Sequence, residues 1–185
     1  IYPSTIDQAN DEDVKETGES FKSKLSIAWE AAVDEFNFAR TRKVIARITP
    51  VLSNEDGFWP PVRTIARLGL GGPQGSGKQM VSWVHHLDLC RAFEHIIQKE
   101  SLVGPINIAA PSPLENKTFM KKVRKAVGMP IGLPAPSFAI RLGSIFTGVD
   151  PSLILDSSHV IPSRLLKSGF DFTYAELDSA LEDLI

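Results

Sequence analysis

The glycine-rich run GPQGSGKQ at residues 72–79 is the segment whose spacing most invites a chemical interpretation. It matches G-x-x-x-x-G-K, the loop whose backbone N–H groups cradle phosphates. Gln79, however, stands where Ser or Thr normally supplies a hydroxyl to magnesium. Such a loop also follows a buried strand and opens a helix, whereas strand-like residues 80–83 follow here. We therefore predict a sharp glycine turn that approaches a ligand or a neighbouring loop, with Lys78 facing either an anionic group or solvent.

His85 is the other side chain of chemical interest, because it follows Trp83 at the end of a predicted strand. We take His85 as the candidate catalytic residue, with a structural hydrogen bond or a ligand contact as the alternatives. Asp88, near the start of the next predicted helix, suits a helix cap or a fold-stabilising partner better than an acid catalyst. No metal site is expected, because His86 is adjacent to His85 and no third ligand stands at a suitable spacing.

The composition describes an ordinary globular chain of one or at most two domains. It has 185 residues, of which 43% are hydrophobic and 23% charged, and a formal net charge of -2. This charge gives no reason to expect nucleic acid as a partner. The single cysteine, Cys90, excludes an internal disulfide and is expected to be a buried thiol. No apolar run reaches the roughly 20 residues of a membrane span, so we expect a soluble protein.

Helices and strands alternate in the predicted secondary structure, which indicates an α/β fold with parallel strand pairing. The acidic run from Asp7 to Glu19 is expected to be a solvated connector. Helices are predicted at 20–40, within 58–70, and at 87–98, 117–127, 137–146, 151–157 and 174–184, and strands at 43–48, 79–85 and 104–109. We expect the proline-rich last third to form a smaller helical cap beside the sheet.

Several separated stretches together resemble one family, the epimerase-like atypical short-chain dehydrogenase/reductases. The most specific is the long glycine-tryptophan-histidine stretch, and the others follow it in the order seen in that family. These stretches are RLGLGGP (67–73), GSGKQ (75–79), SWVH (82–85) with Asp88-Leu89, GPIN (104–107), APSP (110–113), VIP (160–162) and GF (169–170). The dipeptides at 29–30 and 47–48 fit the same pattern, so the resemblance covers nearly the whole chain.

The resemblance implies a Rossmann-type parallel sheet that binds NADP or NAD, closed by a small helical cap on the substrate side. Residues 1–110 would be the remainder of the NAD(P)-binding domain, including the glycine-rich loop 69–79, and residues 111–185 the C-terminal cap. It further implies that about a hundred residues, with the cofactor's glycine-rich turn, precede Ile1 in the whole protein. Arg47, Ile48 and Thr49 would pass the nicotinamide and contact the cofactor.

The proton-transfer pair of the superfamily, a tyrosine one helical turn before a lysine, is absent. With Glu30 taken as the glutamate that follows the pair, the two positions are occupied by Lys22 and Ser26. Substrate contacts are expected from aromatic and cationic side chains that could hold a sugar or an anion. These candidates are Trp59, Arg63, Lys78, Gln79, Trp83 and His85. Trp59 and Trp83 could equally be core residues.

Two functions remain open from the sequence. One is an oxidoreductase or epimerase that acts on a small polar or nucleotide-sugar-like substrate, and the other is a non-catalytic structural or accessory subunit of a larger assembly. A homodimer through the helix at 20–40 is a further expectation, because Phe36 and Phe38 lie about 200° apart on the helix and cannot both face one core. The compartment, organellar or not, cannot be derived from the sequence.

Overall fold

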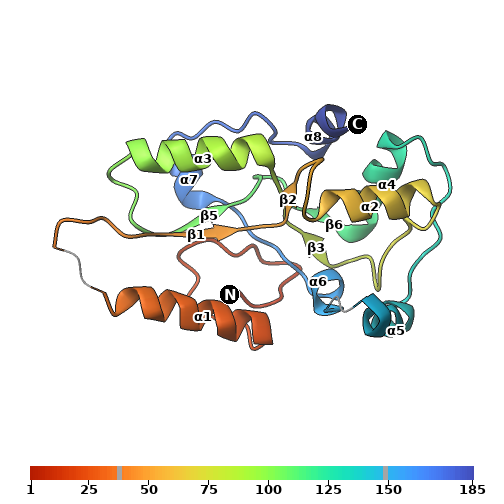
Figure 1. Cartoon of the computed structure of the whole chain (residues 1–185), viewed down its shortest axis with the longest axis horizontal. Helices are drawn as coiled ribbons and strands as arrows, with labels where there is room; N and C mark the ends of the chain where they lie inside the picture. The colour runs from red at the N-terminus through yellow and green to blue at the C-terminus, as the bar shows by residue number, and fades with distance from the viewer. Residues whose placement is uncertain (37–38, 148–149) are drawn as a thin grey trace.

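The computed structural model describes residues 1–36, 39–147 and 150–185. Its strands are short, and its helices contain more residues than its strands (Figure 1). The helices are α1 (Phe21–Asp34), α2 (Trp59–Arg67), α3 (His86–Gln98), α4 (Asn116–Ala126), α5 (Ser137–Thr147), α6 (Ser152–Leu155), α7 (Ser163–Lys167) and α8 (Leu177–Leu184). The strands are β1 (Val44–Ile48), β2 (Val51–Leu52), β3 (Met80–Val81), β4 (Val84–His85), β5 (Gly104–Ile108) and β6 (Leu114–Glu115).

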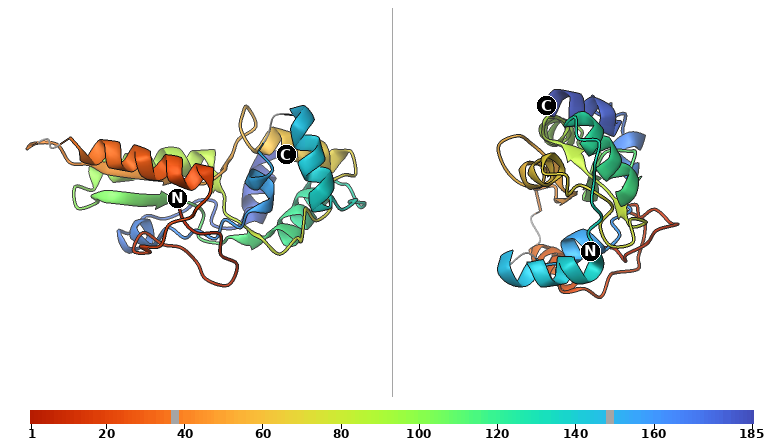
Figure 2. Two further views of the ribbon diagram at one scale, coloured as in Figure 1. Left: turned by 90° about the horizontal axis from the view of Figure 1, so that it is seen from below. Right: turned by 90° about the vertical axis from the view of Figure 1, so that its right-hand side faces the viewer.

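Parallel pairing of β1 with β5 forms the centre of the fold. Their register runs from Val44 opposite Gly104 to Ile48 opposite Ile108. β2 pairs in parallel with β4, while β3 and β6 pair antiparallel. α1 lies on one side of the β1–β5 pair and α3 on the other, which Figure 2 shows from a second direction. The predicted α/β class with parallel strands is confirmed.

Local sequence signals account for how three of the helices begin. The Ser20 hydroxyl accepts a hydrogen bond from the backbone N–H of Ser23 and so caps α1. Pro60 and Pro61 occupy the first turn of α2, where a missing N–H costs nothing. The His85 side chain accepts from the N–H of Leu87 at the start of α3. α1 ends at Asp34 rather than Arg40, and Phe38, half of the predicted homodimer contact, lies outside the described residues.

Two clusters of buried apolar side chains form the core. The first joins α2, α4 and α8 around Trp59, Trp83 and Phe119. The second joins β5, α3 and α7 around Ile106, Ile96 and Leu165. Each cluster contains residues from both sides of position 110. The division of the chain at 110 into two regions stays a prediction.

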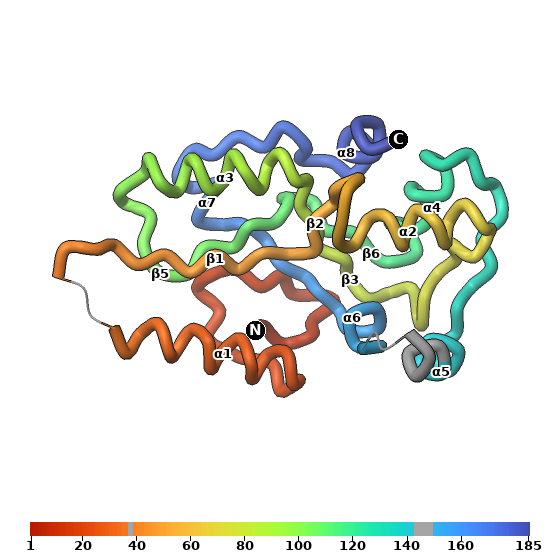
Figure 3. Tube along the Cα trace, in the orientation of Figure 1, coloured from red at the N-terminus to blue at the C-terminus, as the bar shows by residue number. Residues whose placement is uncertain are grey.

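The acidic N-terminal run is only in part the solvated connector that its composition predicted, because it is irregular and mostly exposed but buries two polar residues. Asn10 and Glu12 are buried, and the backbone of Asn10 forms a bridge with Val160. The Glu12 carboxylate accepts hydrogen bonds from the backbone N–H groups of Asn107 and Arg164. The run therefore follows the segment near Val160, as the trace in Figure 3 shows, and its buried polar side chains satisfy backbone groups.

Two further expectations are wrong in detail. The strand expected at 79–85 is two separate strands, β3 and β4, which pair with different partners. Cys90 is exposed rather than buried. α3 buries Asp88, Ala92 and Ile96, and Cys90 lies about 200° around the helix from Asp88, so its thiol points away from the core.

The glycine-rich segment makes a close backbone contact. A Cβ on Gly72 would lie 2.4 Å from the carbonyl carbon and oxygen of Leu133, so no other residue fits without moving that backbone. Gly75 and Gly77 adopt positive φ angles of 57° and 69°. The expected turn with a close approach to a neighbouring loop is confirmed, and that neighbour is the segment around Leu133.

The second cluster gives a test of the core with adjacent residues of one type. Leu165 is fully buried, whereas Leu166 is 46% exposed. Leu165→Ala should lower the free energy of unfolding by about 2–5 kcal/mol, because it removes buried methyl groups and leaves a cavity. Leu166→Ala should lower it by less than about 1 kcal/mol. Urea unfolding of both variants measures the difference, and equal losses would contradict this packing.

Candidate functional site

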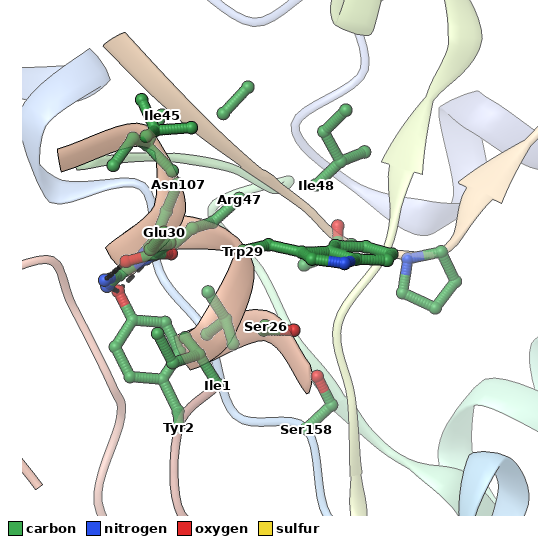
Figure 4. A pocket seen from close by; sticks show the side chains of 15 residues that line it. Ile1, Tyr2, Ser26, Trp29, Glu30, Ile45, Arg47, Ile48, Asn107 and Ser158 are labelled. Atoms are coloured by element: carbon green, nitrogen blue, oxygen red, sulfur yellow. Dashed lines mark hydrogen bonds and ion pairs between the residues drawn. The ribbon is translucent and has the colours of Figure 1, made fainter. Parts of the chain in front are cut away.

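A cleft lies between α1 and the carboxyl end of β1. It consists of two adjoining cavities of about 440 and 510 Å³. Figure 4 shows the first cavity, with Trp29 from α1 extending across it towards Ile48. In parallel α/β sheets ligands bind outside the carboxyl ends of the strands, so the cleft has the expected location for a site. The residues common to both cavities are Ile1, Tyr2, Ile48, Pro50, Ser158 and Val160.

A hydrogen-bonded network forms one wall of the first cavity. Arg47 on β1 donates two hydrogen bonds to the Glu30 carboxylate, at 2.8 Å from Nε and 2.7 Å from Nη2. Its Nη1 donates to the Tyr2 hydroxyl at 2.7 Å, and that hydroxyl donates to Asn107 Oδ1 at 2.8 Å. A bidentate Arg–carboxylate pair is directional as well as strong. The network therefore fixes α1 and the N-terminal segment against β1 and β5.

The network also determines the protonation of its members. Burial raises the pKa of Tyr2, although the hydrogen bond and charge of Arg47 act in the opposite direction. Burial alone would lower the pKa of Arg47, but its hydrogen bonds to Glu30 and Tyr2 outweigh that effect and raise it. Tyr2 is therefore a neutral phenol and Arg47 a cation at neutral pH.

The three residues expected at the cofactor, Arg47, Ile48 and Thr49, all line the first cavity. Ile48 is 47% exposed, so its side chain is available to a ligand. The guanidinium of Arg47 is already held by Glu30 and Tyr2, and the Thr49 hydroxyl donates to the Ile108 carbonyl. The structure brings the three together, and their contact with a cofactor stays a prediction.

The six residues expected at the substrate do not line either cavity of the cleft. Trp59 and Trp83 are fully buried in the first core cluster, which is the alternative left open by the sequence. Gln79 is buried and its amide donates to the carbonyls of Gln74 and Ile154. Arg63 is hydrogen bonded to Asn54, and Lys78 is exposed. The structure therefore does not assemble these residues into one site.

His85, the sixth of them, lies in a separate buried cluster between α3 and the C-terminal segment. Its ring lies against Tyr174 with centroids 3.8 Å apart, and its Nε2 is 3.3 Å from Asp183 Oδ2. Burial, followed by the charge of His86, lowers the pKa of His85. The neighbouring Asp88 accepts hydrogen bonds from the backbone of residues 173 and 174 and pairs with Arg91. These contacts hold both side chains in the fold, and a catalytic role for His85 stays a prediction.

Sequence reasoning missed most of the residues that line the cleft. Tyr2, Trp29, Asn107 and Ser158 come from four distant parts of the chain, so no spacing relates them. Two signals were available. The resemblance included the dipeptide at 29–30 and the stretch that ends at Asn107, and Lys22 and Ser26 occupy the positions where the superfamily's tyrosine and lysine were expected. Ser26 lines the first cavity and Lys22 the second.

Within residues 1–36, 39–147 and 150–185, no helix is long and apolar enough to cross a membrane. The same residues contain no group of three or more His, Cys, Asp or Glu side chains placed to hold a metal ion.

Comparison with known sequences relates the chain to epimerase family proteins. It is 35% identical over 184 residues to an epimerase family protein of Staphylococcus aureus, covering 100% of this chain and 60% of that protein. The identity to an epimerase family protein of Staphylococcus saprophyticus is 38% over 165 residues, which cover 89% of this chain and 54% of that protein. Residues 135–184 match a family described as a domain of unknown function, DUF1731. The chain thus spans about 60% of the length of the Staphylococcus aureus relative.

Solved structures agree with this relationship. The human epimerase family protein SDR39U1, solved with NADPH, has a TM-score of 0.90 and 32% identity, covering 99% of this chain and 61% of that one. A nucleoside-diphosphate sugar epimerase from Corynebacterium glutamicum has a TM-score of 0.76 and 25% identity. That match covers 96% of this chain and 33% of the epimerase chain. Together with the parallel strands, these define a Rossmann-type α/β protein. The predicted resemblance to the C-terminal part of an epimerase-like atypical short-chain dehydrogenase/reductase is therefore confirmed.

The lowered pKa of His85 makes stability depend on pH. Because the folded state favours the neutral imidazole, the unfolded state binds the proton more readily. The contribution of His85 is complete above its unfolded pKa of about 6.5 and is lost as the pH falls below that value. Unfolding free energies at pH 7.5 and 5.5 should show a smaller fall for His85→Gln than for the unmodified protein. An equal fall would contradict this assignment.

The Tyr2 hydroxyl should contribute to stability. Tyr2→Phe removes two hydrogen bonds, the one that the hydroxyl donates to Asn107 Oδ1 and the one that it accepts from Arg47 Nη1, so the free energy of unfolding should drop by about 1–2 kcal/mol. Tyr174→Phe removes an exposed hydroxyl that bonds to Asp183 and should cost less than about 0.5 kcal/mol. Chemical denaturation of both variants measures these losses. Equal losses of unfolding free energy would contradict the network.

Proposed function

We propose that this chain is part of an NADP- or NAD-binding oxidoreductase or epimerase that acts on a small polar or nucleotide-sugar-like substrate. In this proposal the first cavity of the cleft receives the nicotinamide end of the cofactor. The observation that carries it is the position of that cavity, at the carboxyl end of β1 and lined by Arg47, Ile48 and Thr49. NADPH in the structure of the human relative supports the choice of cofactor.

The lining of the cavity suits a flat, partly apolar ring. Trp29 is 66% exposed and Ile48 is 47% exposed, so an aromatic and an aliphatic surface are available on opposite walls. Together they would exclude water from both faces of a bound ring. Arg47 would hold the wall in place through Glu30 and Tyr2 rather than contact the ring with its guanidinium. The bound nicotinamide would supply or accept a hydride.

A non-catalytic accessory subunit is the second candidate. The observation that favours it is the residue pair on α1, where Lys22 and Ser26 stand in place of the tyrosine and lysine that transfer protons in the superfamily. A protein of this kind would retain the cofactor as a structural ligand. The two candidates share the cofactor site and differ in whether a substrate is turned over.

Two exposed isoleucines provide a matched test of the cofactor site. Ile48→Glu places a carboxylate in the cavity, where it would repel the anionic cofactor and disrupt the apolar wall. In the natural protein that contains this chain, the variant should weaken NADPH binding at least about tenfold, equivalent to about 1.4 kcal/mol. Titration of NADPH fluorescence measures the dissociation constant.

Ile97→Glu is the control, because Ile97 is 71% exposed on α3, on the other side of the strands. It should leave NADPH binding unchanged. Equal affinity of both variants and the unmodified protein would show that the first cavity does not receive the cofactor.

A further inference from the structure

The second cavity of the cleft differs in chemistry from the first. It is about 510 Å³ in volume and adjoins the first cavity across Ile48 and Pro50. Polar side chains are more frequent in its lining than in that of the first cavity, which has more isoleucines and valines and a tryptophan. These polar residues are Ser4, Asn10, Glu19, Ser20, Lys22, Ser23, Ser152, Asp156, Ser157, Ser158 and His159.

Part of this polar lining is committed to the fold. The amide of Asn10 donates to backbone and hydroxyl oxygens, the hydroxyls of Ser20 and Ser23 bond to each other, and Ser157 Oγ accepts from the N–H of Met80. These groups have limited capacity left for a ligand. They give the cavity a rigid polar wall.

Three other groups are available. Among the described residues, the side-chain hydroxyls of Ser26 and Ser158 have no hydrogen-bond partner, and both line the first cavity, on the same side of the Trp29 ring in Figure 4. Ser158 also lines the second cavity. Within the part of the chain that the structure describes, the Lys22 ammonium has Asp156 as its one ion-pair partner, at 3.9 Å, and its side chain is 37% exposed. Lys22 can therefore direct most of its three N–H donors towards a ligand.

The charges around the second cavity decide which ligands it suits. Glu19 and Asp156 are acidic and Lys22 is the basic side chain among these three, so their sum is one negative charge. A phosphate or diphosphate would meet two carboxylates and a single ammonium. An uncharged molecule that carries several hydroxyls would meet donors and acceptors without this repulsion.

We propose that the second cavity is the substrate subsite and that it binds a small, uncharged, polyhydroxylated carbonyl compound. Lys22 donates a hydrogen bond to an oxygen of the compound, Ser158 contacts it where the two cavities meet, and Ser26 contacts it from the adjoining first cavity. The proposal rests on the assignment of the first cavity to the nicotinamide, because that places the two ligands side by side. It locates the substrate at α1 and the segment 156–159, away from Trp59, Trp83 and His85.

The probe for a test is L-erythrulose, an uncharged hydroxy ketone that stays open-chain, added to the NADPH-loaded natural protein. Saturation-transfer NMR should show binding, and Lys22→Met should weaken it at least about fivefold. The matched control is Lys24→Met. Lys24 is an exposed lysine on α1, about 200° around the helix from Lys22, and lines neither cavity, so its replacement should change nothing.

Four outcomes would overturn the proposal: no transfer to erythrulose in the unmodified protein, equal binding by Lys22→Met, equal weakening by Lys24→Met, or tighter binding of erythrulose 4-phosphate. NADPH affinity is measured on the same samples and separates the two assignments. Erythrulose binding that depends on Lys22, in a protein that does not bind NADPH, would support the polar subsite while contradicting the proposed cofactor site.

Discussion

The structure depends on one buried polar residue, Asn107, which connects the N-terminal segment and the segment around Ile161 to the central strands. Asn107 is fully buried on β5, opposite Arg47 on β1. Its Oδ1 accepts from Tyr2, its backbone N–H donates to Glu12, and its Nδ2 donates to the Ile161 carbonyl. A buried amide costs free energy unless its hydrogen bonds are made, so these partners are constrained together.

This constraint creates the cleft. Tyr2 continues the network from Asn107 to Arg47, and Arg47 continues it to Glu30 on α1. α1 is therefore held by charged hydrogen bonds on one side, while Trp29, the residue before Glu30, remains 66% exposed. The space between this helix and the carboxyl end of β1 is left open to a ligand. The position of the cleft and the different linings of its two cavities follow from how α1 is attached to β1 and β5.

Sequence patterns predicted the elements that depend on local periodicity. The amphipathic pattern of α3 and the apolar runs of β1 and β5 are determined by neighbours a few residues apart, and these elements lie within two residues of their predicted bounds. The resemblance to epimerase-like proteins likewise rested on contiguous stretches, and it is confirmed. Elements whose burial depends on distant partners were not predictable in this way. Glu12 is buried because its carboxylate meets Asn107 and Arg164, which its acidic neighbours do not indicate.

The candidate site shows the same limit. A tryptophan has the same sequence signature in a core as beside a ligand. Trp59 and Trp83, which were predicted to contact a substrate, are buried in the core. Trp29, which was not among the predicted site residues, lines the cleft. Arg47, Ile48 and Thr49 were placed through the resemblance and do line it. The cleft's other walls come from residues 2, 107 and 158, which only the folded chain brings together.

A crystal structure of the natural protein with NADPH would test the central claim most directly. We expect the nicotinamide ring in the first cavity, between Trp29 and Ile48, with the network of Tyr2, Arg47 and Glu30 intact. A nicotinamide bound elsewhere, with the cleft beside α1 filled by protein side chains, would contradict the account.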